Sequence, residues 1–264
     1  MTSIARRNLR TPVVVSLLFL MTGCVVAPRG DAAPPRAGSS YLIHLPGIAG
    51  DTNFDRSWMN GLRDGGAADE VELYDWTCRR PGLDALQAYS RNRSQARKVA
   101  RLIAERRREY PTGRIILTAE SGGTGVAVWA LERLPKDVKV DEVLLIAPAL
   151  SPGYDLTGAL EHVKGTFRSF NSPGDWFMLG IGTRLFGTID GVYTDAAGLV
   201  GFHRPSGGNL TQYRKLVEMR YDPAWLNYGD LGNHAGGMSV AFARYFLAPL
   251  LLHDEQHKVP VASL

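Results

Sequence analysis

Short apolar runs alternate with helical patterns along most of this sequence. Runs with the length and composition of buried strands are residues 41–45, 71–76, 114–119, 140–147, 166–171 and 215–221. Helical patterns fill residues 56–63, 84–108, 122–134 and 238–252, with weaker ones at 156–163 and 177–186. Because strands that alternate with helices favour right-handed crossovers, we predict an α/β fold with a mostly parallel central sheet flanked by helices. Ligands bind such sheets beyond the carboxyl ends of the strands.

The length of the chain fits one folded domain. It has 264 residues, 45% of them hydrophobic, which is enough for a full core, and we place the domain at residues 41–264. Too few residues separate Ala147 from Thr166 for a large lid domain. The longest stretch without periodicity, residues 187–211, is rich in glycine, and such segments are usually functional or mobile. We therefore expect a candidate site to be open or covered by this segment alone.

The N-terminal residues have the pattern of an export signal. Three arginines precede an apolar run, residues 13–21, that is shorter than the ~20 residues a membrane span needs. The run ends in Leu-Met-Thr-Gly-Cys24, which resembles the lipobox of bacterial lipoproteins. The resemblance implies a signal peptide at 1–23, lipidation of Cys24, a flexible linker at 24–40, and a membrane-anchored protein on the periplasmic or cell-surface side. A plain signal peptide that is cut elsewhere is the alternative.

The charge of the chain argues against nucleic acid as a partner. The sequence has 30 Lys and Arg against 26 Asp and Glu, but three of the arginines belong to the signal segment, which leaves 27 against 26. A nearly neutral chain of mixed signs has no electrostatic reason to bind nucleic acid. We find no metal-ligand spacing of His, Cys and carboxylates, and no phosphate-binding glycine loop followed by Lys, so no cofactor is expected.

Ser121 stands where an apolar strand passes directly into a helix rich in glycine and alanine. A turn this tight strains and exposes the serine, and it needs small neighbours such as Ala119, Gly122 and Gly123. The arrangement resembles the nucleophile elbow of the α/β-hydrolase superfamily, Gly-x-Ser-x-Gly, with Ala119 at the first glycine position. It implies that Ser121 is a catalytic nucleophile. An ordinary capping serine is the alternative.

A nucleophilic serine needs a base, and the base needs an orienting acid. His234 follows the last predicted strand and precedes the last helix, where the superfamily keeps its base. Asp175 lies in a Pro-Gly turn just past the preceding strand, and the order Ser121, Asp175, His234 is that of the superfamily. The competing acids are Asp155, Asp190, Asp195 and Asp230. A capping or loop role for His234 and a simple turn role for Asp175 also remain open.

An acyl-transfer site also needs donors aimed at the developing oxyanion. One is the amide of Gly122, next after the serine. The loop that begins His44-Leu-Pro-Gly47-Ile48 resembles the oxyanion loop of the superfamily, which implies the amide of Ile48 as the second donor. His44 and Gly47 then support the loop.

These residues together predict a serine hydrolase that cleaves a carboxylic ester, or a related acyl bond, through an acyl-enzyme. Its partners would be a small-molecule or lipid-like acyl substrate and, through Cys24, the membrane; the oligomeric state is not predicted. Aromatic side chains that could line an acyl pocket, or equally belong to the core, are Trp176, Phe177, Tyr193 and Phe202. The alternatives are an acyltransferase with the same triad and an inactive surface-anchored binding protein on a hydrolase scaffold.

Overall fold

The computed structural model describes residues 38–175, 179–180, 182–205 and 210–252. The predicted signal peptide, Cys24 and most of the predicted linker lie outside the described residues. In the part of the chain that is described, no helix has both the length and the apolar character needed to cross a bilayer.

The centre of the fold is a parallel sheet whose strands follow the predicted runs. The strands are β1 (Tyr41–Leu45), β2 (Glu70–Leu73), β3 (Ile115–Glu120), β4 (Glu142–Ile146), β5 (Phe167–Phe170) and β6 (Leu216–Met219). They form a six-stranded sheet in the order β2-β1-β3-β4-β5-β6, and every neighbouring pair is parallel. The prediction of an α/β fold with a parallel central sheet is confirmed.

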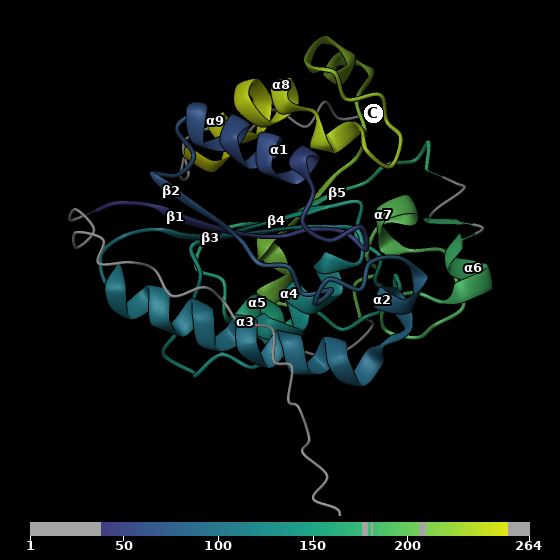
Figure 1. The fold of residues 1–264 in the computed structure, drawn as a ribbon, viewed down its shortest axis with the longest axis horizontal. Helices are drawn as coiled ribbons and strands as arrows, with labels where there is room; N and C mark the ends of the chain where they lie inside the picture. Colours follow the sequence, from purple (N-terminus) through teal and green to yellow (C-terminus); the bar gives the residue numbers. More distant parts are fainter. Residues whose placement is uncertain (1–37, 176–178, 181, 206–209, 253–264) are drawn as a thin grey trace, which may run out of the picture. The chain divides into compact units, whose positions relative to one another are not determined.

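Helices cover both faces of the sheet (Figure 1). On one face lie α1 (Asn53–Asp64), α8 (Val240–Phe242) and α9 (Ala248–Leu252), and on the other lie α3 (Tyr89–Glu109), α4 (Gly123–Leu131) and α5 (Thr157–Glu161). The shorter elements are α2 (Leu83–Gln87), α6 (Thr183–Phe186), α7 (Ala197–Val200), and the turns η2 (Gln212–Lys215), η3 (Pro223–Tyr228), η4 (Gly236–Met238) and η5 (Ala243–Leu247).

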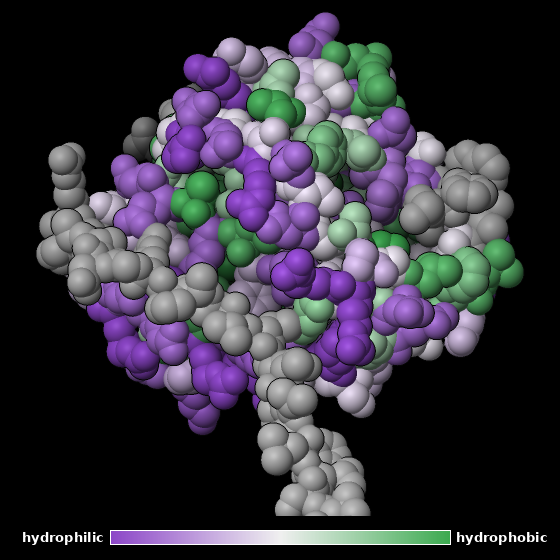
Figure 2. All heavy atoms as spheres, in the orientation of Figure 1, coloured by the Kyte–Doolittle hydropathy of each residue, from purple (hydrophilic) through white to green (hydrophobic). Residues whose placement is uncertain are grey.

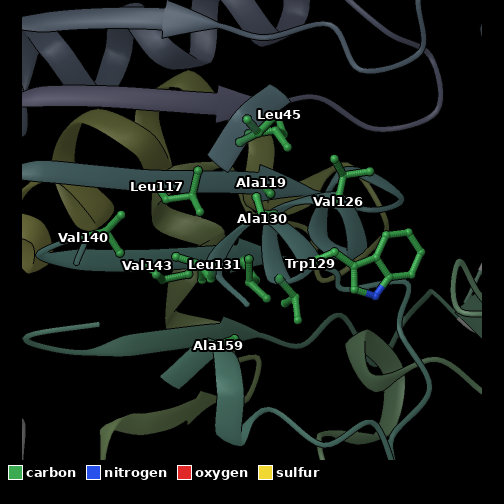
Figure 3. Close-up of a cluster of buried hydrophobic side chains, with 14 of the residues drawn as sticks. Leu45, Leu117, Ala119, Val126, Trp129, Ala130, Leu131, Val140, Val143 and Ala159 are labelled. Carbon is green, nitrogen blue, oxygen red and sulfur yellow. The ribbon is translucent and has the colours of Figure 1, made fainter. Parts of the chain in front are cut away.

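Two hydrophobic clusters, one on each face, hold the helices to the sheet. Alternate residues of β3 divide between them, so that Ile115 and Leu117 join the cluster with α3 and α4, and Ile116 joins the cluster with α1. Every residue of α4 is buried. Figure 3 shows Val126, Trp129 and other α4 side chains among those of the strands. The helix that follows Ser121 is therefore fixed from all sides.

Two predicted helices are broken in the structure. The helix expected at 84–108 is split at Ala88, where the side chain of Asn92 donates to the carbonyl oxygen of Ala85 at 2.7 Å and takes up an acceptor that helix continuation would use. The helix expected at 238–252 contains a wide turn, η5, just before Pro249. Proline has no N–H to donate and clashes with the carbonyl four residues earlier, which explains the wider turn.

The glycine-rich segment 187–211 is anchored to the chain that follows β4. The amide of Ile189 donates to Ala149 O at 3.0 Å, and that of Gly198 to Pro148 O at 2.7 Å. Phe202 is buried in the core, whereas Tyr193 is 71% exposed. Trp176 and Phe177 lie outside the described residues. Of the two roles open to Phe202 from the sequence, an acyl-pocket residue or a core residue, the structure shows the core role.

Candidate active site

Ser121 lies in a strained turn at the carboxyl edge of the sheet. Strand β3 ends at Glu120, α4 begins at Gly123, and Ser121 between them has a φ of 47°. A non-glycine residue in this left-handed region costs about 1–3 kcal/mol and persists only where its surroundings enforce it. Here the Ser121 amide donates to Ile146 O of β4 at 2.9 Å, and the Ser121 carbonyl accepts from the Thr124 amide at 3.1 Å. The backbone on both sides holds the serine in place.

The two glycines after Ser121 allow a close approach to the loop that follows β1. A Cβ on Gly123 would lie 2.4 Å from Pro46 O, and one on Gly122 would lie 2.8 Å from the Cγ2 of Ile48. Neither position has room for a side chain unless its neighbour moves. This crowding explains why small residues follow the serine, and it shows that the turn after Ser121 packs directly against the loop that contains Ile48.

The structure brings His234 and Asp175 into contact. Asp175 lies in the turn after β5, and its Oδ2 is hydrogen-bonded to Nδ1 of His234, which lies between η3 and η4. The two loops also meet through their backbones, because the Gly174 amide donates to Gly232 O at 3.0 Å. This contact orients the imidazole ring through its Nδ1.

The acids that competed with Asp175 have other partners. Asp190 accepts from the amide of Ser151 at 2.9 Å, Asp155 accepts from the Thr157 amide at 2.9 Å, and Asp195 binds Arg184 at 2.6 Å. Asp230 is close to His234 in sequence, yet its carboxylate accepts from the Gly232 amide at 2.8 Å. This bond shapes the histidine loop, the segment between η3 and η4 that carries His234. Among these acids, Asp175 alone contacts His234 in the described structure.

The structure does not pair His234 with Ser121. In the described residues no hydrogen bond joins the Ser121 hydroxyl to the imidazole, and Nε2 of His234 instead lies 3.4 Å from Oε1 of Glu120. The sequence patterns did not predict a role for Glu120. Its position as an acid directly before the candidate nucleophile was the available signal.

The charges around His234 favour its protonated form. Burial alone would lower the pKa of His234, but the hydrogen bond to Asp175 and the charges of Glu120 and Asp175 raise it above its ordinary value. Burial raises the pKa of Glu120 to about 7, although the charge of His234 and a hydrogen bond from the Gly47 backbone oppose the rise. Both shifts favour the protonated form of the group concerned.

The loop after β1 and the turn after Ser121 each contain a backbone amide without a hydrogen-bond acceptor among the described residues. These are the amides of Ile48 and Gly122, and neither donates a hydrogen bond to any other described residue. The Ile48 carbonyl accepts from the Gly82 amide at 2.8 Å, and the indole of Trp76 donates to Pro46 O at 2.6 Å, so the loop itself is held firmly. Unpaired amides on a rigid backbone are what an oxyanion hole requires.

His44 and Gly47, expected as loop supports, have separate roles. His44 is a buried residue of β1 rather than a loop residue, and its ring contacts Thr118 at 3.0 Å and Asp55 at 3.3 Å. Burial lowers the pKa of His44, against the opposing effect of Asp55. Gly47 lies against the Glu120 carboxylate, where a Cβ would be 1.9 Å from Oε2. His44 thus stabilises the strand, and Gly47 makes room for Glu120.

The described residues contain no group of three or more His, Cys, Asp or Glu side chains arranged to hold a metal ion. The side chains of Ser121, Asp175 and His234 are of the kinds that support proton transfer and nucleophilic attack by a hydroxyl group.

Comparisons with known proteins give distant structural likenesses. No family model and no curated protein matches the sequence. A candidate hydrolase of the alpha/beta superfamily from Xanthomonas campestris is 15% identical with a TM-score of 0.45, over 81% of this chain and 98% of that one. Aspergillus fumigatus lipase B is 18% identical with a TM-score of 0.45, over 82% of this chain and 53% of the lipase, so the match spans about half of that protein. A cutinase-like protein from Cryptococcus has a TM-score of 0.36 at 16% identity, over 83% and 98% of the two chains. Likenesses this distant assign no family.

Proposed function

We propose that this protein is a serine hydrolase of the α/β-hydrolase type that cleaves a carboxylic ester through an acyl-enzyme. The observation that carries the proposal is the hydrogen bond between His234 and Asp175 beside the strained turn of Ser121. The unpaired amides of Ile48 and Gly122 on the same edge add to it. These are the parts that acyl transfer needs: a nucleophile, a base oriented by an acid, and donors for the oxyanion.

The proposed reaction has two steps. The Ser121 oxygen attacks the ester carbonyl while its proton passes to Nε2 of His234, and the imidazolium that forms is stabilised by Asp175. The Ile48 and Gly122 amides donate to the oxyanion, which collapses as His234 protonates the departing alcohol. Water, activated by the same nitrogen, then attacks the acyl-enzyme, releases the acid and restores Ser121.

The imidazole has to turn before the first step. Its Nε2 lies against Glu120 and not against the Ser121 hydroxyl. Catalytic hydrogen bonds are often long in unliganded enzymes and tighten only when substrate binds, so this arrangement is compatible with the proposal.

Labelling with a fluorophosphonate probe, together with hydrolysis of short p-nitrophenyl esters, tests the proposal. We expect Ser121→Ala to abolish labelling and to lower the hydrolysis rate by about 10⁴-fold or more. Ser172→Ala is a matched control, because both serines are 6% exposed and Ser172 holds the Asp175 amide through its backbone carbonyl. A wild-type protein that is labelled no more than Ser121→Ala would rule out the nucleophile. Ester turnover with glycerol or an amine as acceptor would show whether the acyl group passes to water or to another molecule.

We also propose that the protein is exported and anchored to the membrane by lipid on Cys24. The proposal rests on the N-terminal sequence alone. Mass spectrometry of the mature N-terminus should find an acylated Cys24, and a chain that starts elsewhere without lipid contradicts the anchor. A disulfide between Cys24 and Cys78, the two cysteines of the sequence, would use the same sulfur and would also exclude it.

A further inference from the structure

The environment of Nε2 of His234 is the least expected feature of the site. A neutral imidazole whose Nδ1–H donates to Asp175 has a lone pair at Nε2. That lone pair would face the Glu120 carboxylate at 3.4 Å, and two acceptors repel one another. A proton on either group removes this repulsion, and a proton on Nε2 makes the contact an ion pair.

Glu120 is held in this place by its surroundings. It is the last residue of β3, its side chain is 13% exposed, and one of its oxygens lies against Gly47 of the loop after β1. The Gly47 backbone also hydrogen-bonds to the carboxyl group. Because the strand and the loop are both packed, the carboxyl group cannot move away from His234 without disturbing the oxyanion loop.

We propose that Glu120 is a positioning residue that keeps a proton on Nε2 of His234 in the resting site. This inference rests on the proposed function, since it concerns the nitrogen that would accept the Ser121 proton. While the proton is held there, Nε2 cannot act as a base. When the proton leaves to solvent, the lone pair is free, the imidazole can turn to the Ser121 hydroxyl, and the ionised Glu120 stays behind with its bond from Gly47.

Other acidic groups also face the pair formed by His234 and Glu120. Asp55 of α1 faces Glu120 and raises its pKa, but Asp55 is paired with His44 and its own pKa is lowered despite its burial, by hydrogen bonds from His44 and Thr52. Asp175 faces both members of the pair. On the histidine loop itself, burial raises the pKa of Asp230.

The pH profile of kcat/KM on a p-nitrophenyl ester tests the inference. For Glu120→Gln we expect the acidic limb of the profile to move to lower pH by about one unit. A shift of about one unit is the smaller end of the effect of a charge about 4–6 Å away. The variant should then be about tenfold more active than the wild type at acid pH. A structural role alone would lower activity at every pH. An unmoved limb overturns the inference.

Glu218→Gln is the matched control. Glu218 is also a sheet carboxylate whose pKa is raised by burial, and a glutamine can still accept from the Phe202 amide. Its acidic limb should stay in place. If Asp230→Asn moves the limb as far as Glu120→Gln does, the assignment to Glu120 is wrong.

NMR titration of the His234 imidazole separates this inference from the proposed function. The signal is assigned by its loss in His234→Asn, and we expect its pKa above the ordinary 6.5 in the wild type and lower in Glu120→Gln. A wild-type value at or below 6.5 overturns the inference even if the variant does not fold. A protein that neither hydrolyses esters nor binds the probe refutes the proposed hydrolase function. The titration still decides whether Glu120 holds a proton on His234.

Discussion

The Gly174 amide donates a hydrogen bond to the Gly232 carbonyl oxygen at 3.0 Å, and the contact joins the loop of Asp175 to the loop of His234. A Cβ on Gly174 would lie 2.6 Å from that oxygen, so the two backbones touch with no room between them. The loops that carry the acid and the imidazole therefore also meet through a backbone contact that involves neither side chain.

Gly174→Ala should separate these two loops. The clash is with backbone, which cannot rotate away, so we expect a loss of about 1–3 kcal/mol in the free energy of unfolding. Because a misplacement of about 1 Å can cost 10²-fold in rate, kcat/KM should fall by about that factor. Gly153→Ala is the control, since a Cβ there meets no atom within 4 Å and should change neither quantity. Equal activity of both variants would contradict the coupling of the loops.

Asp175→Asn tests the acid. An amide cannot stabilise the imidazolium as a carboxylate does and can hold the wrong tautomer, so kcat should fall by about 10⁴-fold while the fold is kept. Asp195→Asn is the control, because Asp195 instead binds Arg184, whose side chain is 65% exposed. Ester assays and circular dichroism on both variants measure the two effects. A wild-type rate in Asp175→Asn would show that another acid orients His234.

Gly122→Ala tests the oxyanion site. Its new Cβ would push against the Cγ2 of Ile48 at 2.8 Å and move the two amides apart. Loss of one such donor costs about 10²–10³-fold in kcat, with a smaller effect on KM. The double variant Gly122→Ala/Ile48→Ala removes the obstructing methyl group and should restore part of the rate. Such a recovery distinguishes a clash with Ile48 from a general distortion of the turn that contains Ser121.

The fold was predictable because its signals are local. The apolar runs give the strands, and alternation with helices gives the parallel sheet, within a few residues at each end. Because all parallel strands end at one edge, the sequence positions of Ser121, Asp175 and His234 predicted their shared location. The breaks at Ala88 and before Pro249 depend on how individual backbone carbonyls are satisfied, which apolar periodicity does not report.

The details of the site were less predictable. Asp230 lies nearer to His234 in sequence than Asp175 does, yet the turn directs its carboxylate to the Gly232 amide. Glu120 was overlooked because its contact depends on how the loop after β6 returns to the end of β3. The glycine-rich segment 187–211 offered no sign of its hydrogen bonds to residues after β4.

The surface near α6 also departs from the pattern of a polar exterior. Figure 2 shows hydrophobic residues at the surface over α6, and the exposed apolar side chains of this part of the chain include Leu185 and Phe186, at 65% and 42%. Sequence periodicity gave no indication of this, because α6 is a single short helix of four residues.

Stability as a function of pH gives a last prediction, on Glu120. Its pKa is raised from 4.5 to about 7 in the folded protein, so its favourable contribution is complete below pH 4.5 and is lost as the pH rises to about 7. The raised pKa of His234 acts in the same direction, with a loss that begins near 6.5. Glu120→Gln removes the pH-dependent contribution of Glu120 to stability and reduces that of His234. Relative to the wild type, the variant should therefore gain about 1–3 kcal/mol in the free energy of unfolding between pH 5 and pH 8. Urea unfolding at both pH values measures this, with the exposed Glu105→Gln as the control. Wild-type and Glu120→Gln stabilities that change in parallel would show that Glu120 keeps its ordinary acidity in the fold.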